Sequence, residues 1–412
     1  MANTDVKWFS FDNTNAPQLT NTWGCLIDVL DACLVTGFGT QLVSNLTILD
    51  GVGTATFGSN HNFKQFQVIE FSGSSIPELN KEFKVLGITN NKIEFVVDLP
   101  DQSVTGTVSA KLASLGWTKA FAGTQKGVYQ AKDKTVNPYF LRVDNSRDPV
   151  YTDSYAKFAK VGILDSCSGI DDFSGNQAPF NSANPTKNWV GTGSGSSASV
   201  GWFKWHYARG TSASSFSTEL TTPSDGNRSW VLVGDKTSFF ILPALTPTST
   251  ASFNKIPYGF ALFRKKDICI PVLVANNNGG GVSTGQHHDN PLLNSTYAGF
   301  AFLKNIKNSI SNTVLTTQIG GFSTFSGYSG AVTQDTLDGD VFMDIFAKDG
   351  SGYLCGVVDL AKSVLHDSSN DQEIKLVTDT NTPYLFVRTA TNVVGGASAI
   401  LKTALAFNLG GY

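Results

Sequence analysis

The fold class is decided by a stretch that reads Phe83-Lys84-Val85-Leu86-Gly87-Ile88, then Asn90-Asn91, then Ile93-Glu94-Phe95-Val96-Val97. In the two longer runs the apolar residues recur at a period close to two, which places alternate side chains on opposite faces of a β-strand. The Asn90-Asn91 pair between the runs has the chemistry of a turn. The stretch therefore predicts short strands separated by a turn.

The same pattern extends on both sides of this stretch, from Leu46 to about Leu112. Turns rich in Gly, Ser, Asn and Pro recur at the short spacing that is typical of a small barrel or sandwich. We therefore predict one compact β module over residues 46–115. Its further strands are expected at Thr54–Phe57, Gln67–Phe71 and Gly106–Ala110.

A segment before the module has a helical period instead. We predict a helix over residues 22–35, ended by Gly37 and capped by a side chain from residues 20–22. An extended lead-in precedes it, so residues 1–45 are expected to form an N-terminal segment of their own. The apolar residues that recur at steps of three and four, and so share one helix face, are Trp23, Leu26, Ile27, Leu30, Cys33 and Leu34.

Short strands continue after Gly116, with longer connections between them. Residues 116–412 are therefore expected to form a larger, sandwich-like β-rich domain, and the whole protein to be mainly β with few helices. Two short helices are predicted in it, at Asp359–Leu365 and within Ala397–Ala406. Strands are expected at Val128–Ala131, Tyr139–Val143, Trp202–Tyr207, Trp230–Val233, Phe239–Leu242, Gly259–Phe263, Ile268–Val274, Ala298–Leu303, Tyr353–Val358 and Tyr384–Arg388.

Composition excludes several classes of protein. Hydrophobic residues make up 41% of the 412 residues and charged residues 15%, whereas about 25% is usual for charged residues; this is too apolar for a disordered chain. The net charge is −3 and the longest basic run is Arg264-Lys265-Lys266, so we expect no nucleic-acid partner. No run approaches the length of a membrane helix, and residues 1–5 do not resemble a signal peptide. We expect no membrane insertion and synthesis in a cytoplasm.

Several short patterns suggest chemistry, and each has a simpler interpretation. Gly281-Val282-Ser283-Thr284-Gly285 matches a nucleophile elbow but lacks the strand and helix that such an elbow needs. His287-His288-Asp289 could bind a metal or be a surface loop. Asp335, Asp338, Asp340 and Asp344 could hold calcium or form a solvated turn. The five cysteines lack metal-site spacing and are expected to be free thiols. We predict no catalytic residue, no cofactor and no metal, and hence a protein that is not an enzyme.

The densest aromatic run is Trp202-Phe203-Lys204-Trp205-His206-Tyr207. Such a strand could stack sugars or lie against another chain. We therefore assign a possible interaction surface to Trp202, Phe203, Trp205 and Tyr207. The alternative is that the strand packs in the core on both faces.

Residues 24–39, GCLIDVLDACLVTGFG, resemble a segment near the start of tailed-bacteriophage virion proteins, where an aromatic lead-in like Trp8-Phe9 also comes first. The module that follows is similar to a small domain of phage tail and baseplate proteins. The further matching residues are Ala55-Thr56-Phe57, His61-Asn62-Phe63, Leu79–Val85, Ile93-Glu94-Phe95, Thr105–Val108, Leu141–Asp144, Ser229–Asp235 and Phe239-Phe240.

The resemblance implies a structural subunit of a virion, made in the cytoplasm of a host bacterium. A tail or baseplate component is the first expectation and a capsid decoration protein the second. The expected partners are other virion proteins and further copies of the chain, with loops 191–197 and 276–281 ordered by these neighbours. Two alternatives stay open: a virion protein that binds a glycan of the host surface, and a glycan-degrading enzyme.

Overall fold

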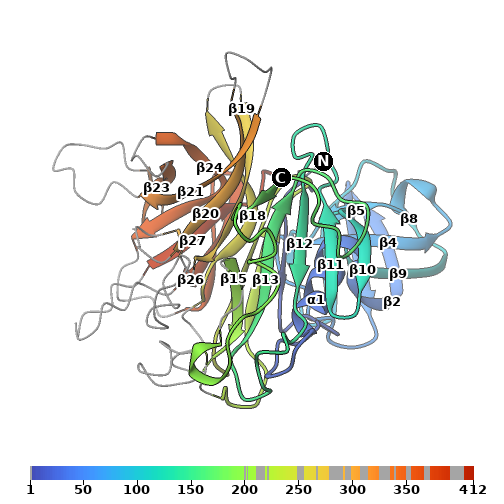
Figure 1. Ribbon diagram of the computed structural model, residues 1–412. Helices are drawn as coiled ribbons and strands as arrows, with labels where there is room; N and C mark the ends of the chain where they lie inside the picture. The colour runs from blue at the N-terminus through green and yellow to red at the C-terminus, as the bar shows by residue number, and fades with distance from the viewer. Residues whose placement is uncertain are drawn as a thin grey trace.

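The computed structural model shows a mainly β protein made of a small curled sheet and a larger body (Figure 1), which confirms the predicted fold class. No helix in the described residues is long and apolar enough to span a membrane. The structure describes residues 2–198, 201, 203–209, 219, 222–247, 255–265, 268–277, 291–292, 298–306, 314–323, 335–337, 340–348, 354–365, 372–389 and 403–412.

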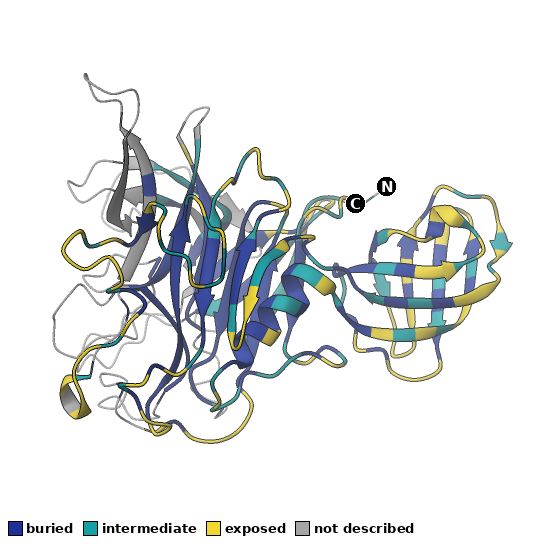
Figure 2. Ribbon diagram, turned by 45° about the vertical axis from the view of Figure 1, so that its right-hand side comes forward, coloured by how far each residue is buried: buried dark blue, intermediate teal, exposed yellow. Residues whose placement is uncertain are grey.

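The small sheet contains the strands between residues 38 and 112. Its strand order is β5-β4-β9-β2-β3-β7-β6, with β8 paired to β2, and it curls into a half-barrel that stands apart from the larger body (Figure 2). The strands are β2 (Phe38–Leu49), β3 (Val52–Phe57), β4 (Val68–Ser74), β5 (Glu82–Lys84), β6 (Gly87–Ile88), β7 (Lys92–Val96), β8 (Gln102–Ser103) and β9 (Gly106–Leu112).

Strand β7 shows how the sequence gives the small sheet an inner and an outer face. Ile93 and Phe95 are buried while Glu94 and Val96 face outward, so the two-residue period of the sequence becomes an inner and an outer face. The Phe95 ring centroid lies 4.5 Å from that of Phe83 and 5.1 Å from that of Phe71. These three rings fill the inside of the half-barrel.

The sheet begins at Phe38, eight residues before the predicted start of the module at Leu46. Within β2, Phe38, Gly39, Leu46 and Ile48 are buried, whereas Leu42 is 68% exposed. Residues 40–45 between these buried positions are paired but none is buried, and their sequence carries no alternation of apolar and polar residues that would reveal a strand.

The predicted helix is confirmed, with its last part wound more widely. Helix α1 (Cys25–Leu30) continues directly into a π-helical segment (Asp31–Thr36), where the Gly37 amide donates to the Ala32 carbonyl at 2.8 Å. Gly37 has φ +69°, and a Cβ there would lie 2.3 Å from the carbonyl oxygen of Leu112. Glycine therefore ends the helix for both conformational and steric reasons.

The start of α1 is capped from far away along the chain, which corrects the predicted local cap. The side-chain oxygen of Asn145 accepts from the amides of Gly24 at 2.9 Å and Leu26 at 3.2 Å. Asn145 also donates to the Phe158 carbonyl at 2.9 Å. The helix is thereby fixed to the larger sheet.

The larger body is one antiparallel network with additional cross-pairings. Its strands are β1 (Lys7–Ser10), β10 (Thr118–Gly123), β11 (Lys126–Gln130), β12 (Phe140–Asp144), β13 (Lys157–Leu164), β14 (Gln177–Ala178), β15 (Phe203–Ala208), β16 (Trp230–Gly234), β17 (Phe239–Pro243), β18 (Tyr258–Lys265), β19 (Ile268–Asn277), β20 (Ala298–Ile306), β21 (Val314–Ser323), β22 (Asp335–Leu337), β23 (Asp340–Lys348), β24 (Leu354–Leu365), β25 (Ile374–Asp379), β26 (Thr382–Thr389) and β27 (Thr403–Asn408).

Residues 1–45 do not form a segment of their own. Strand β1 pairs with β16, with Trp8 opposite Val233 and Phe9 opposite Leu232. The extended lead-in is therefore a strand of the larger body. The predicted boundary at residue 45 lies within β2.

Strands β16 and β17 lie between two hydrophobic cores. Leu232 and Ile241 face the core that also contains α1, whereas Val233 and Leu242 face the core shared with β24, β26 and β27. A strand buried on both faces needs a continuous apolar run. The sequence Trp230-Val231-Leu232-Val233 has this form.

Two predicted helices are wrong, because the residues are strands. Asp359–Leu365 lies in β24, and the described end of the second helix, 403–406, lies in β27. These strands pair with each other, for example Val364 with Ala404. Their small and apolar residues fit both a helix face and a buried strand, and long-range pairing selects the strand.

The loop at residues 191–197 has contacts of its own, which corrects the expectation that neighbours order it. The Gly191 amide donates to Asp148 at 2.9 Å, the Tyr155 hydroxyl donates to the Gly195 carbonyl at 2.8 Å, and Ser194 and Ser197 form a reciprocal cap. Within the second loop, residues 278–281 lie outside the described residues.

Candidate functional site

The aromatic run on β15 lies in the core, so the predicted interaction surface there is wrong for its described members. Phe203, Trp205 and Tyr207 are at most 1% exposed, and Trp202 lies outside the described residues. The Trp205 indole donates to the Val274 carbonyl at 2.9 Å and the Tyr207 hydroxyl donates to the Thr22 carbonyl at 2.7 Å. β15 pairs with β13 and β19, so neighbours cover both its edges.

The alternate residues of β15 form a buried ionic cluster. Lys204 Nζ lies 2.8 Å and His206 Nε2 lies 2.9 Å from the same carboxylate oxygen of Glu219. The Tyr151 hydroxyl donates to the other Glu219 oxygen at 2.9 Å. Burial lowers the pKa of His206 to about 4, and the nearby Arg209 charge acts in the same direction. Because Lys204 and His206 are both at most 1% exposed, this cluster is part of the core and offers no surface to a ligand.

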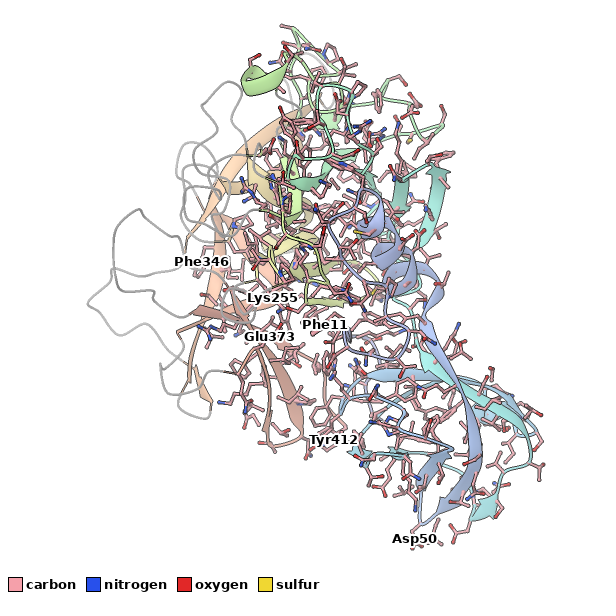
Figure 3. The ribbon with its side chains drawn as sticks, turned by 90° about the horizontal axis from the view of Figure 1, so that it is seen from below. Phe11, Asp50, Lys255, Phe346, Glu373 and Tyr412 are labelled. Atoms are coloured by element: carbon pink, nitrogen blue, oxygen red, sulfur yellow. The ribbon has the colours of Figure 1, made fainter. Side chains whose placement is uncertain are left out.

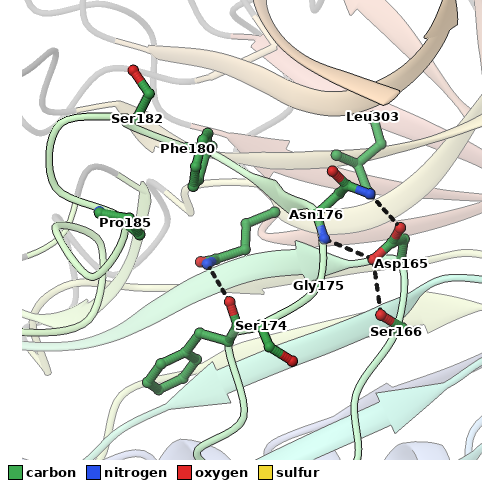
Figure 4. Close-up of a pocket in the computed structure, with 11 residues that line it drawn as sticks. Asp165, Ser166, Ser174, Gly175, Asn176, Phe180, Ser182, Pro185 and Leu303 are labelled. Carbon is green, nitrogen blue, oxygen red and sulfur yellow. Dashed lines mark hydrogen bonds between the residues drawn. The ribbon is translucent and has the colours of Figure 1, made fainter. Parts of the chain in front are cut away.

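A pocket of about 760 Å³ opens at the surface next to the connection between β13 and β14 (Figure 4). This volume lies within the range of about 300–1,000 Å³ that is usual for small-molecule sites. The connection supplies most of the lining, and Leu303 of β20 closes one side. The lining residues are Asp165, Ser166, Phe173, Ser174, Gly175, Asn176, Gln177, Phe180, Ser182, Pro185 and Leu303.

Asp165 is the fixed polar group of this pocket. Its carboxylate accepts from the Asn176 amide N–H at 2.8 Å, from the Asn176 side-chain nitrogen at 2.7 Å and from the Ser166 hydroxyl at 3.1 Å (Figure 4). These bonds hold the carboxylate in one orientation. The group is half-buried, so it remains within reach of a ligand.

The wall behind Gln177 is rigid. The Gln177 side chain donates to the Phe173 carbonyl at 2.8 Å and accepts from the Trp189 indole at 2.8 Å. The rings of Phe173 and Trp189 stack with centroids 5.6 Å apart. The Arg142 guanidinium carbon lies 4.6 and 4.3 Å from these two centroids, which adds cation–π attraction.

Asp172 shapes the loop that carries Ser174. Its carboxylate accepts from the amide and hydroxyl of Ser168, at 2.8 and 2.7 Å, and from the amide and hydroxyl of Ser174, at 2.9 and 2.7 Å. The Ser168 and Ser174 hydrogen bonds lower the pKa of Asp172 well below its usual range. Asp172 is therefore ionised at neutral pH and orders this side of the pocket.

The chemistry of the lining fits a polyhydroxylated ligand. Hydroxyls, amides and one carboxylate supply hydrogen bonds, and Phe180, which is 41% exposed, supplies an apolar face. The lining residues that the structure describes include a single charged side chain and no basic one. Among the described residues, no three metal-ligating side chains gather in one place.

The structure does not bring the other candidate site residues together, or they lie outside the residues that it describes. His287–Asp289, Gly281–Gly285 and Asp338 lie outside the described residues. Asp335 and Asp340 are not register partners, since Asp335 pairs with Phe342 and Asp340 with Leu337. Asp344 lies 3.4 Å from the ammonium of Lys362.

Sequence reasoning missed the pocket. Residues 165–185 carry no periodic pattern, and Leu303 is far from them in the chain. Phe180 is an aromatic residue within a polar stretch, but single apolar residues at the surface are common and do not by themselves indicate a site.

Comparison with known proteins adds little. No protein-family model and no curated protein matches the chain. A solved structure titled "Phage phi92 endosialidase" is matched with a TM-score of 0.17 and 10% sequence identity, over 92% of this chain and 53% of that one. The chain thus spans about half the length of that structure, and so low a TM-score carries no argument about fold or function.

Proposed function

We propose that the protein is a structural subunit of a tailed-bacteriophage particle, most specifically a tail or baseplate component, that acts through contacts with other virion proteins and with copies of itself. The observation that supports this function is spatial. Some of the segments that resemble virion proteins lie far apart in the sequence and yet contact one another, whereas others, such as Ala55–Phe57 and Ile93–Phe95, lie within the small sheet.

Three contacts connect these segments or their direct neighbours. Trp8-Phe9 pairs with β16, which belongs to the resembling stretch Ser229–Asp235. Asn145, the residue after Leu141–Asp144, caps α1. Lys7, the residue before Trp8-Phe9, forms an ion pair of 2.6 Å with Glu82, which lies in the resembling stretch Leu79–Val85.

The test is the composition of purified particles. Mass spectrometry of particles of the phage that encodes the chain should detect it at a fixed copy number, and a cryo-EM map should place it on the tail or baseplate. Density on the head would favour the capsid decoration role instead. Presence in the infected-cell lysate combined with absence from purified particles would refute the structural role.

A second function is supported by the pocket itself: the subunit binds a glycan of the host surface. A glycosidase of the usual kind needs two carboxylates that flank the scissile bond, whereas Asp165 is the single carboxylate among the described residues that line the pocket. We therefore propose binding without hydrolysis. Co-sedimentation of the purified protein with host envelope fragments, without release of reducing sugar, is the expected result.

A further inference from the structure

We propose that the pocket between Asp165 and Phe180 takes a neutral sugar of a surface glycan and excludes sugars that carry a carboxylate, sulfate or phosphate. This inference rests on the second function proposed above and specifies its ligand class. The recognition site then lies at the connection between β13 and β14 and not on the buried strand β15.

The charge of the lining supports the exclusion of anions. Among the described lining residues Asp165 is the single charged one, and three hydrogen bonds from Asn176 and Ser166 hold its carboxylate in place. An anionic sugar would lose hydration beside a fixed negative charge and meet no basic side chain of the described lining in return. Arg142, in the wall behind Gln177, is fully buried and donates to Asp171 at 2.8 Å, and it is not one of the residues that line the pocket.

The geometry of Asp165 supports binding of hydroxyl groups. A carboxylate offers about four acceptor positions, and the bonds from Asn176 and Ser166 occupy three of them. A sugar hydroxyl can donate to the remaining position, and a hydrogen bond to a charged acceptor is stronger than one between neutral groups. The Ser174 hydroxyl, whose proton is donated to Asp172, can accept from a sugar hydroxyl, and the Ser182 hydroxyl can accept or donate.

Phe180 supports the recognition of a ring rather than of a flexible polyol. Its side chain is 41% exposed, and in Figure 4 it lies on the other side of Asn176 from Asp165. One face of a pyranose presents C–H groups and its rim presents hydroxyls. The C–H face can cover the aromatic ring while the rim reaches Asp165, because aromatic faces attract such weakly positive hydrogens.

The experiment uses the full-length protein on a glycan array that contains matched pairs, each a neutral oligosaccharide and its uronic-acid or sialylated counterpart. The strongest neutral hit is then titrated calorimetrically. We expect binding of neutral members and at least tenfold weaker binding by Phe180→Ala and by Asp165→Asn. Asp165→Asn should also reduce the discrimination between neutral and anionic partners, because it removes the charge and keeps the shape.

Val190→Ala is the matched control, because Val190 is 55% exposed and does not line the pocket; it should bind like the parent. Circular dichroism and melting temperature establish that every variant is folded. Phe180 and Asp165 are tested separately, so failure of one variant to fold leaves the other.

The outcomes separate the two proposals. Binding of anionic glycans, or of neutral glycans with an affinity that neither variant changes, overturns this inference and leaves glycan binding standing. Absence of binding to any glycan and to host envelope fragments overturns the second function and this inference together. Detection of the protein in purified particles would still support the structural role.

Discussion

His206 shows how one buried residue couples stability to pH. It shares the carboxylate of Glu219 with Lys204, and Nδ1 of its ring lies 3.3 Å from the Asn276 side-chain oxygen. Burial makes a positive charge on His206 unfavourable, and the nearby charges of Arg209 and Lys204 add to this effect. The folded protein therefore keeps this imidazole neutral at neutral pH.

We predict that the variant His206→Gln shows a weaker loss of stability in acid than the parent. The pKa of His206 is about 4 in the folded protein and 6.5 for an unperturbed histidine, so the unfolded chain binds more protons between these values. Stability is then fully present above about pH 6.5 and falls as the pH drops toward 4. Melting temperatures of both proteins across this range provide the measurement.

Gln preserves a hydrogen-bonding side chain at this position. A general loss of packing would lower the melting temperature at every pH and leave the slope of melting temperature against pH unchanged. Identical slopes for the parent and His206→Gln between pH 4 and 6.5 would contradict the prediction.

Among the elements, the curled sheet depends on a small aromatic core. Phe95 of β7 contacts Phe71 and Phe83 across the half-barrel. Gly53 on the neighbouring β3 has no side chain, and a Cβ there would lie 2.3 Å from the Phe95 ring. The ring thus fills space that a glycine leaves open.

We predict that Phe95→Ala lowers the free energy of unfolding of the small sheet by about 3–5 kcal/mol, the usual cost of removing a buried phenylalanine. Urea unfolding monitored by circular dichroism measures it. Val96→Ala, at the next and 41% exposed position, should cost less than about 1 kcal/mol. Equal effects of the two substitutions would show that the faces of β7 are assigned wrongly.

At the scale of the whole molecule, the two bodies meet through polar and aromatic contacts close to both ends of the chain (Figure 2). The buried ammonium of Lys84 donates to the carbonyls of Leu409 and Gly410. The Tyr412 ring stacks on Phe66 at 5.7 Å, whereas Asp50 marks the distant tip of the small sheet (Figure 3). The C-terminal residues therefore hold the small sheet in position.

We predict that Lys84→Ala uncouples the two bodies. The carbonyls of Leu409 and Gly410 would lose their charged donor, and hydrogen bonds to charged groups contribute about 1.5–3 kcal/mol. Calorimetry should show a separate, lower transition for the small sheet, while the transition of the larger body stays within a few degrees. Lys92→Ala, an exposed lysine on β7, should leave the profile unchanged.

The pH dependence of stability is a second test of the role of Lys84. Burial lowers the pKa of Lys84 to about 8 from 10.5, so the unfolded chain binds more protons between these values and stability should rise with pH across this range. Lys84→Ala should lack this rise. A single unchanged transition together with an unchanged pH profile would contradict the role assigned to Lys84.

The sequence by itself determined the local elements, because the period of apolar residues reports which faces of an element are buried. It predicted β7 from Ile93 and Phe95, the helix from Leu26 and Leu30, and the mainly β class. It failed where local period carries no information: β13 is buried along its whole length and shows no alternation, and β24 and β27 become strands through their mutual pairing.

Only the tertiary structure decided which distant residues meet. Asn145 caps a helix that begins about 120 positions earlier, Trp205 is buried because its ring packs in the core beside Phe239 and Tyr258, and the pocket joins Asp165 to Leu303. Such contacts arise from the pairing of strands far apart in the chain, which depends on the packing of the whole sheet. A local pattern of residue types is compatible with many pairings, and the shared hydrophobic cores select one of them.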